Sequence, residues 1–517
     1  MKAIITMLIC GFGVSSFGQQ GWISITTENL NTRYSVSNNG TFFHNPFTQD
    51  PPGGFIVPKD SLVGSIHAMF FLAAGEDANG NLKGAAANYQ TSDFAPGPYL
   101  PVVENYSSQS YIDKYGVGLW NISKSQIDYH IAHWADPGYV VPGIIASWPG
   151  NGDSGNGESL LLAPFYDSDG DQLYEPENGD YPLIRGDKAV YTIINDGKHM
   201  HPSGFDKIGL EVHMLFYQYD VPTDDVLTNT VFFQTTVFNR GTVNLQNFHA
   251  GHLIDFDLGN PFNDYIGTDP GRNLAYIYNG TSNDGPFSGN PGFGAMPPAA
   301  GIVNLDGSMN SHILLPNGMV PSTSSQYYNV LKGLLPFGDQ QLDGDSIPTT
   351  YIYSDIDPSG WNEYNGAIVN TPGDRRSVIG HSAETFGPGK ILCYNSAAIF
   401  ARKYETSMTA SVDSLLLVAD YIQDFYDNQN FYCETQFLGL EESPELVISL
   451  FPNPANDHIQ ISGIDSGTFR IINPEGKEIL NGSLENPVIQ TGSLKNGFYI
   501  LEITSGGKHG RKSFMKE

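Results

Sequence analysis

The sequence has few basic residues and little charge overall. Only 25 of its 517 residues are Lys or Arg, against 55 Asp and Glu, and charged residues make up 15% of the chain. The net charge of −30 repels phosphate, so we expect neither nucleic acid nor an anionic membrane surface as a partner. An aromatic content of 12% excludes a disordered acidic chain.

Long apolar runs are almost missing. One short run, residues 3–14, follows Lys2 and precedes the small residues Ser16 and Gly18. This pattern predicts a secretory signal peptide over residues 1–18. The run is too short to cross a bilayer, and no later stretch is long enough, so we expect no transmembrane span.

Cysteine is scarce, with three residues in the whole chain. Cys10 lies in the predicted signal, which leaves Cys393 and Cys433. These two form either a single disulfide or two buried thiols, and a disulfide scaffold is excluded. The sequence also lacks the Gly-x-Ser-x-Gly, His-Glu-x-x-His and phosphate-loop motifs of common enzymes.

What the chain does have is Gly, Pro and alternating apolar residues. The 58 Gly and 33 Pro, with so little charge, favour short strands joined by turns over a helical bundle. Alternation predicts a half-buried strand over 207–220, a central strand over 226–239 and a third over 249–258. A capping pattern predicts a helix over 123–134, and an apolar stripe predicts another over 409–426. We therefore expect a mainly β, β-sandwich-rich body with a few packed helices.

The charge changes near the end of the chain. Residues 446–517 contain seven acidic and seven basic side chains, so nearly all of the net charge lies before them. We predict a body over 19–438, possibly with subdomains, a linker over 439–445 and a separate domain over 446–517. Short alternating runs around Ile459, Ile471 and Leu501 predict that this last domain is an immunoglobulin-like β-sandwich.

The last domain also resembles a known family. Residues 450–455 read LFPNPA, residues 471–477 read IINPEGK and residues 494–501 read LKNGFYIL, ahead of a basic end over 508–516. These motifs, in this order, resemble the type A sorting domain of the type IX secretion system. The resemblance implies a Bacteroidetes bacterium and passage through the type IX translocon. It also implies cleavage by a sortase-like protease, followed either by release or by attachment to surface lipopolysaccharide.

The body is similar to a large group of uncharacterised Bacteroidetes surface proteins. The similarity lies in short motifs, among them GNLK at 80–83, LAPF at 162–165 and GDRR at 373–376. It implies export and a shared fold, and it implies no activity.

The sharpest chemical signal is an Asp-rich loop. Asp167, Asp169 and Asp171 alternate around Gly170, and Asp180 follows at a distance that would close a coordination shell. Alternating carboxylates on a Gly-containing loop are typical of Ca²⁺ ligands. The sequence predicts a calcium site from these four residues, with a solvated acidic turn as the alternative.

A second acidic set is Asp255, Asp257, Asp264 and Asp269. Asp255 and Asp257 share one face of an extended strand. The set is a second calcium site, a general acid/base pair or an exposed polar face, and the sequence leaves these alternatives open. A zinc site from His199 and His201 with Glu211 and His213 is a weaker alternative, since no Glu follows His-x-His at close spacing.

Two functions remain. The first is a non-catalytic, calcium-stabilised binding, adhesion or structural body at the cell surface, with a glycan or a surface protein as its ligand. The second is a secreted polysaccharide hydrolase that uses an Asp pair such as Asp255 and Asp257. We expect the first.

Overall fold

The structure is a computed structural model. It describes the following residues: 22–45, 54–197, 200–287, 291–306, 309–316, 319–355, 360–364, 370–407, 409–429, 449–464, 466–473, 478–484, 486–505 and 508–516. The predicted signal peptide and the linker over 439–445 lie outside this part of the chain. The chain divides into two compact units, residues 1–434 and 435–517, which are described separately.

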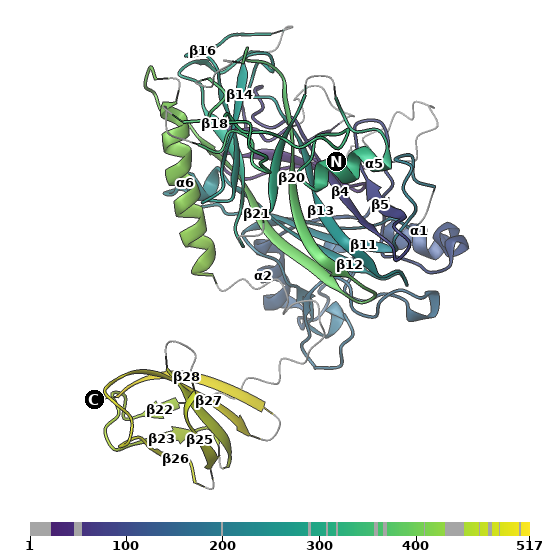
Figure 1. Ribbon diagram of the computed structural model, residues 1–517. Helices are drawn as coiled ribbons and strands as arrows, with labels where there is room; N and C mark the ends of the chain where they lie inside the picture. Colours follow the sequence, from purple (N-terminus) through teal and green to yellow (C-terminus); the bar gives the residue numbers. More distant parts are fainter. Residues whose placement is uncertain are drawn as a thin grey trace, which may run out of the picture. The chain divides into compact units, whose positions relative to one another are not determined.

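The first unit, the body, contains two large antiparallel sheets (Figure 1). Sheet one has the order β1-β2-β3-β4-β13-β20-β19, and β5 also pairs with β4. Its strands are β1 (Ser24–Glu28), β2 (Arg33–Ser37), β3 (Thr41–Phe42), β4 (Ala68–Glu76), β5 (Leu82–Ala86), β13 (Leu245–Phe256), β19 (Ser311–Leu315) and β20 (Arg375–Phe386).

Sheet two has the order β14-β15-β18-β21-β12-β11-β10-β6, and β7 also pairs with β10. Its strands are β6 (Ala95–Pro96), β7 (Leu119–Ser123), β10 (Lys188–Asn195), β11 (Leu210–Gln218), β12 (Val231–Asn239), β14 (Asp264–Asp269), β15 (Leu274–Asn279), β18 (Ala299–Asn304) and β21 (Ile391–Ala401). Two small hairpins are β8 (Phe165–Tyr166) with β9 (Tyr181–Pro182), and β16 (Asn283–Asp284) with β17 (Gly294–Ala295).

The two sheets pack face to face through an aromatic core. Phe42 of sheet one lies 4.8 Å from Phe216 of sheet two, measured between ring centroids. Phe216 stacks in turn on Phe233 of the neighbouring strand. Burying side chains of this size supplies the main driving force for folding, so the mainly β sandwich expected from the sequence is confirmed.

Helices cover the outer faces of the sheets. They are α1 (Gln109–Tyr115), α2 (Lys124–His133), α3 (Gly143–Ala146), α4 (Asp225–Thr228), α5 (Ser324–Leu331) and α6 (Ala410–Asp427), with short 3₁₀ turns at Val103–Ser107, Ser154–Asn156 and Pro176–Asn178. Helix α5 packs on β4 and β20, and α6 packs on β21 and β18 (Figure 1). The helices predicted over 123–134 and 409–426 are confirmed as α2 and α6.

The predicted strands exist, but one detail of the prediction was wrong. Strand β11, expected to be half-buried, is buried along its whole length, because a second apolar core covers the outer face of sheet two. Strand β13, predicted as residues 249–258, spans Leu245–Phe256 and pairs with β4 and β20 in sheet one. Strand β12 is central and fully buried, as expected, although residues before Val231 form α4.

Strand β21 carries Cys393, which is disulfide-bonded. The sequence left open whether Cys393 forms a disulfide or stays a buried thiol, and in the structure it forms a disulfide. Cys433, the other cysteine of the expected mature chain, lies outside the described residues.

The second unit is a smaller sandwich of two sheets. One has the order β22-β23-β26 and the other β25-β24-β27-β28. The strands are β22 (Ser449–Phe451), β23 (His458–Ser462), β24 (Gly467–Ile472), β25 (Glu478–Leu484), β26 (Val488–Gln490), β27 (Gly497–Ser505) and β28 (Lys508–Lys516). The alternating residues Ile459, Ile471 and Leu501 form its core, as their spacing predicted.

Candidate functional site

The Asp-rich loop joins the two strands of a small hairpin. Strands β8 and β9 pair, and Tyr166 stacks on Tyr181 with ring centroids 4.7 Å apart. Between these strands, Asp167, Asp169 and Asp171 each bring one carboxylate oxygen within 4.8 Å of the other two. The structure therefore brings together three of the four carboxylates that the sequence assigned to calcium.

Backbone donors shape this loop. Asp167 accepts hydrogen bonds from the backbone N–H groups of Gly170 and Gln172, both at 2.7 Å, and Asp171 accepts one from Leu173 at 2.8 Å. Burial raises the pKa of Asp167, but the N–H donors of Gln172 and Gly170 outweigh it and lower the pKa below its ordinary value. Desolvation and the charge of Asp171 raise the pKa of Asp169.

Asp180 has a different place from the one predicted. It is buried beneath the loop, and its two oxygens accept hydrogen bonds from the N–H groups of Ser168 and Glu175, both at 2.8 Å. Asp180 does not belong to the group of carboxylates that lie within 4.8 Å of one another. These two hydrogen bonds link Ser168 to Glu175 through one side chain, so Asp180 stabilises the conformation of the loop from its base.

Several aromatic side chains lie beside this loop. Trp134, at the end of α2, lies against Gly179, and Tyr166 and Trp134 are 47% and 39% exposed. Tyr129 is exposed one turn earlier on α2, with its ring 4.3 Å from that of His133. We call Tyr129, Trp134, Tyr166 and Tyr181 the aromatic surface.

His130 joins the aromatic surface to the loop. This buried ring donates from Nε2 to the carbonyl of Asp180 at 3.0 Å and accepts from the Tyr139 hydroxyl at Nδ1, also at 3.0 Å. Helix α2 is thereby held against the base of the Asp-rich loop.

The second acidic set separates into one pair and two single residues. Asp255 and Asp257 lie together, as their spacing predicted, and Asp374 joins them, with one oxygen of each within 4.8 Å of the others. Asp264 is buried apart, where it accepts from the N–H of Leu258 at 3.0 Å. Asp269 forms an ion pair with Arg272 at 2.7 Å.

Four further side chains surround these three carboxylates. The Tyr89 hydroxyl donates to Asp255, whose other oxygen lies 3.1 Å from Nε of Arg376. The Nδ1 atom of His67 lies 3.8 Å from a carboxylate oxygen of Asp257, and the His44 ring centroid lies 5.1 Å from that of His67. We call this set the His–Asp cluster; its members are His44, His67, Tyr89, Asp255, Asp257, Asp374 and Arg376.

Burial and neighbouring charges shift the pKa values of several residues in the His–Asp cluster. Burial, followed by the charges of Asp255 and Asp374, raises the pKa of Asp257 well above its ordinary range. Burial and then the charge of Asp255 also raise the pKa of Asp374. Burial lowers the pKa of His44 to about 4, with His67 adding to the effect. Sites with such shifts are candidates for chemistry or cation binding.

The sequence missed five members of this cluster. His44, His67 and Tyr89 precede or follow strands that are distant in the chain, and Asp374 and Arg376 flank the start of β20. The GDRR motif at 373–376 contains both Asp374 and Arg376, so it is the sequence signal that could have located them, although the motif alone indicates no chemical role.

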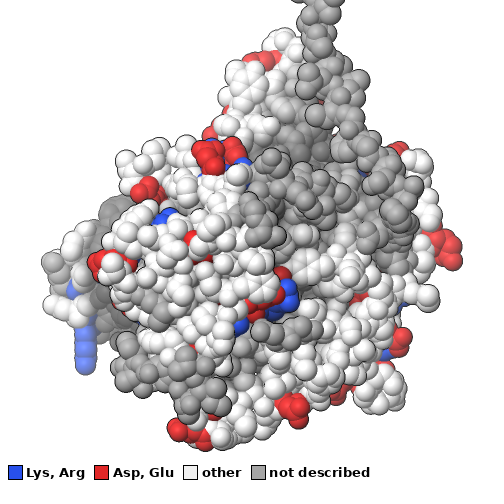
Figure 2. All heavy atoms as spheres, turned by 90° about the horizontal axis from the view of Figure 1, so that it is seen from above, with Lys and Arg blue, Asp and Glu red and all other residues white. Residues whose placement is uncertain are grey.

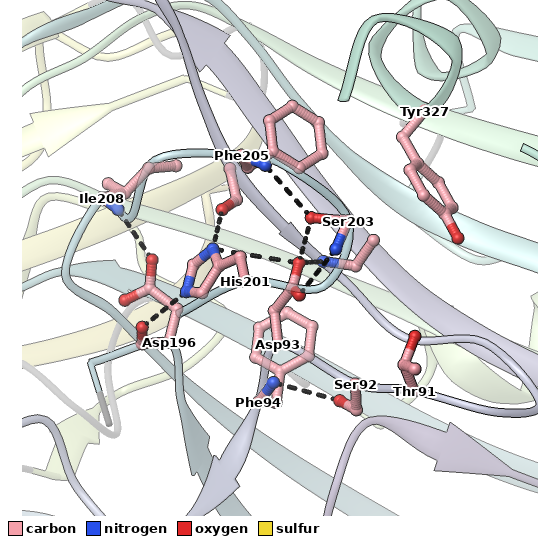
Figure 3. Close-up of polar contacts among 12 residues, drawn as sticks. Thr91, Ser92, Asp93, Phe94, Asp196, His201, Ser203, Phe205, Ile208 and Tyr327 are labelled. Carbon is pink, nitrogen blue, oxygen red and sulfur yellow. Dashed lines mark hydrogen bonds and ion pairs between the residues drawn. The ribbon is translucent and has the colours of Figure 1, made fainter. Parts of the chain in front are cut away.

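The alternative zinc set is not assembled among the described residues. His199 lies outside them. Both ring nitrogens of His201 face carbonyl oxygens, those of Gly84 and Asp196, each at 2.8 Å. Figure 3 shows His201 between Asp196 and Asp93, with the Ser203 hydroxyl bonded to Asp93 rather than to the imidazole.

Glu211 and His213 lie in a separate buried network. The Nε2 atom of His213 lies 3.0 Å from Glu211, which also pairs with Arg240 at 2.8 Å. The Tyr191 hydroxyl lies 2.6 Å from the other nitrogen of His213. These contacts satisfy both side chains, so they account for Glu211 and His213 without a metal.

The comparisons with known proteins assign the second unit. Residues 449–517 match the model of the secretion system C-terminal sorting domain. The chain therefore carries a type IX secretion sorting domain, which directs it to the cell surface or the exterior and implies a Bacteroidetes source. No helix in the described residues is long and apolar enough to cross a membrane.

The body has weaker likenesses. One is to a polysaccharide lyase, at 7% identity and a TM-score of 0.20, which covers 68% of this chain but 39% of the lyase. Another is to a putative aldose 1-epimerase from Escherichia coli K12, at 11% identity and a TM-score of 0.25, covering 74% of this chain and all of the other. No curated protein matches the chain.

Proposed function

We propose that the body is a calcium-stabilised, non-catalytic binding module that makes glycan contacts at the cell surface. The observation that carries this proposal is the adjacency of two features: an Asp-rich loop with three converging carboxylates, and an exposed aromatic surface beside it. Export by the type IX system supplies the setting in which such a module acts.

The loop suits calcium by its chemistry. Asp167, Asp169 and Asp171 offer carboxylate oxygens, the hard ligands that Ca²⁺ prefers. Within the described residues, no Lys or Arg forms an ion pair with any of the three. Three carboxylates this close repel one another unless a cation lies between them.

The aromatic surface suits a glycan. Trp and Tyr rings present flat apolar faces with a polar edge, which pack on the C–H faces of sugar rings while the hydroxyl or indole N–H remains available for hydrogen bonding. The carboxylates of the Asp-rich loop lie beside this surface, whereas charged side chains are sparse on the upper face of the body, which Figure 2 shows. These carboxylates and the net charge of −30 favour neutral glycans over anionic ones.

Calcium removal tests the proposal. Chelation should lower the melting temperature of the purified mature chain, because a ligand bound only to the folded state stabilises it by mass action. The triple variant Asp167→Ala, Asp169→Ala, Asp171→Ala should lose this dependence. Asp343→Ala with Asp345→Ala is the matched control, since that turn also accepts backbone N–H bonds but has two carboxylates.

A glycan array, with and without calcium, tests the ligand. Trp134→Ala and Tyr166→Ala should weaken every glycan signal that the parent chain gives, while the melting temperature stays within a few degrees. A parent chain that melts identically with chelator, or that binds glycans equally well after loss of Trp134, contradicts the proposal.

A second candidate function, polysaccharide hydrolysis, is favoured by one observation. Asp255 and Asp257 lie together and have different surroundings, since Asp255 contacts Tyr89 and Arg376 whereas Asp257 faces His67. Different environments for two carboxylates are what an acid and a base require. Incubation with plant, algal and host glycans tests it: products that Asp255→Asn or Asp257→Asn eliminates at unchanged stability would support hydrolysis.

A further inference from the structure

The His–Asp cluster is assembled by three adjacent strands of sheet one. Asp255 on the middle strand, β13, lies opposite Ala68 of β4 on one side and Arg376 of β20 on the other. The N–H of His67 donates to the carbonyl of Asp255 at 2.9 Å. Strand pairing therefore fixes the backbone from which the cluster's side chains project, although their segments are far apart in the chain.

The donor atoms combine oxygen and nitrogen. Asp255, Asp257 and Asp374 each offer an oxygen within 4.8 Å of the others, and Nδ1 of His67 lies 3.8 Å from Asp257. Two ligands of one metal ion stand roughly 3–4 Å apart, as bond lengths near 2.1 Å require. Small side-chain shifts would bring all four atoms onto one ion.

Besides the ion-paired atoms of Asp255 and Arg376, two buried polar atoms of the cluster have no hydrogen-bond partner within the described residues. They are Oδ1 of Asp374 and Nδ1 of His44, whose ring packs against that of His67. Leaving a buried polar atom unpaired costs about 1–3 kcal/mol, so native proteins rarely keep one without a ligand or water. The His44 nitrogen is independent of the carboxylates, and it points to a missing partner in the same place.

The charges in the cluster also favour a bound cation. Three carboxylates face one guanidinium, since Arg376 pairs with Asp255 at 3.1 Å and with Asp374 at 2.8 Å. The neighbouring Arg375 is engaged by Glu363 instead. With all three carboxylates ionised, as metal ligands must be, they and the guanidinium carry a charge of −2, which one divalent cation would neutralise.

We infer that the His–Asp cluster binds one divalent transition-metal ion of the zinc or manganese class, through Asp255, Asp257, Asp374 and His67. Imidazole nitrogen selects such ions over calcium, whose ligands are oxygen atoms. The site is distinct from the Asp-rich loop and goes beyond the proposed function. Asp257, Asp374 and His67 are 26%, 24% and 39% exposed, so the ion can enter from solvent and retain a water ligand.

Metal titration of the full mature chain tests this inference. After treatment with EDTA, calorimetric titration with Zn²⁺ and with Mn²⁺ should show one site per chain. Asp257→Asn, Asp374→Asn and His67→Gln should each weaken it at least tenfold. The exposed pair His133–Asp136, 2.7 Å apart, provides the matched control, because His133→Gln should leave the affinity unchanged.

A second readout separates metal loss from unfolding. Zinc should raise the melting temperature of the stripped parent chain and have no such effect on the three variants, whose circular dichroism should match the parent's. The triple variant of Asp167, Asp169 and Asp171 should keep the zinc site. Absence of a stoichiometric zinc or manganese site, equal affinity in the cluster variants, or binding of Ca²⁺ alone at the cluster would overturn the inference.

Discussion

Some buried charged side chains of this protein have several hydrogen-bond and ion-pair partners. Glu211 lies fully buried in sheet two, yet it contacts His213, Arg240 and the backbone N–H of Tyr99. Burial raises the pKa of Glu211, but the hydrogen bond from His213 and the charge of Arg240 outweigh it and lower the pKa to about 2. The carboxylate is therefore kept ionised inside the fold by specific partners.

Glu211 should make stability depend on pH in the acid range. Its folded pKa of about 2 lies below the ordinary 4.5, so its contribution is complete above pH 4.5 and is lost as pH falls toward 2. Glu211→Gln should lower stability by about 1–3 kcal/mol at neutral pH and flatten this dependence. Melting temperatures measured at a series of pH values between 2 and 7 test this prediction. Glu384→Gln, at an exposed position, is the control. If the melting temperature of Glu211→Gln fell at acid pH as much as that of the parent chain, the prediction would be contradicted.

Gly179 should be intolerant of any side chain. Its φ of +101° favours glycine, and an added Cβ would come 2.8 Å from the Trp134 ring. Gly179→Ala should cost about 1–3 kcal/mol and alter the Trp134 environment. Gly170→Ala is the matched control, because Gly170 has a φ of +80° with open space around it. Equal melting temperatures for the two variants would show that the Trp134 contact adds nothing.

At the scale of elements, local patterns predicted most of what was found. Helix α2 begins at Ser123 because its side chain and that of Gln126 form a capping box, a signal carried by four consecutive residues. The alternation over β11 located the strand, but it did not show that both faces are buried. That depends on residues such as Trp148, which is distant in sequence and whose ring lies 5.0 Å from that of Tyr191 on the outer face of sheet two.

The same limit applies to the candidate sites. The Asp-rich loop is contiguous, so its three converging carboxylates were predictable from spacing. Only two of the seven members of the His–Asp cluster were predictable: Asp255 and Asp257 alternate along one extended segment, whereas residues such as His67 and Asp374 reach them through strand pairing across the sheet. Pairing partners of strands separated by more than a hundred residues leave no local pattern.

The capping box of α2 should stabilise the element that supports the aromatic surface. Ser123→Ala removes an acceptor for the N–H of Gln126 and should cost about 1 kcal/mol. Thr409→Ala is the matched control, because Thr409 occupies the same position on α6 without a side-chain capping bond. Thermal melts should show a loss for Ser123→Ala alone, and equal losses in both variants would argue against the capping role.

At the scale of the whole molecule, the two units differ in charge and in the features that they carry. The body carries nearly all of the −30 net charge and both candidate sites, while residues 446–517 are close to neutral and hold the sorting domain. The sorting domain has its own core, built around Ile459, Ile471 and Leu501. A unit with its own core can fold without the body, so the sorting domain is separable from the body.

Separability predicts the outcome of moving the sorting domain. Deleting residues 446–517 should leave a folded body in the periplasm, because the body retains its two large sheets but loses the sorting signal. Fusing residues 435–517 to a periplasmic reporter should send that reporter to the cell surface or the medium, because the fusion supplies the signal together with its fold. Surface proteolysis and fractionation of the cells measure both. Surface display of the truncated chain would contradict the assignment of targeting to this domain, and retention of a folded fusion would show that the body contributes to export.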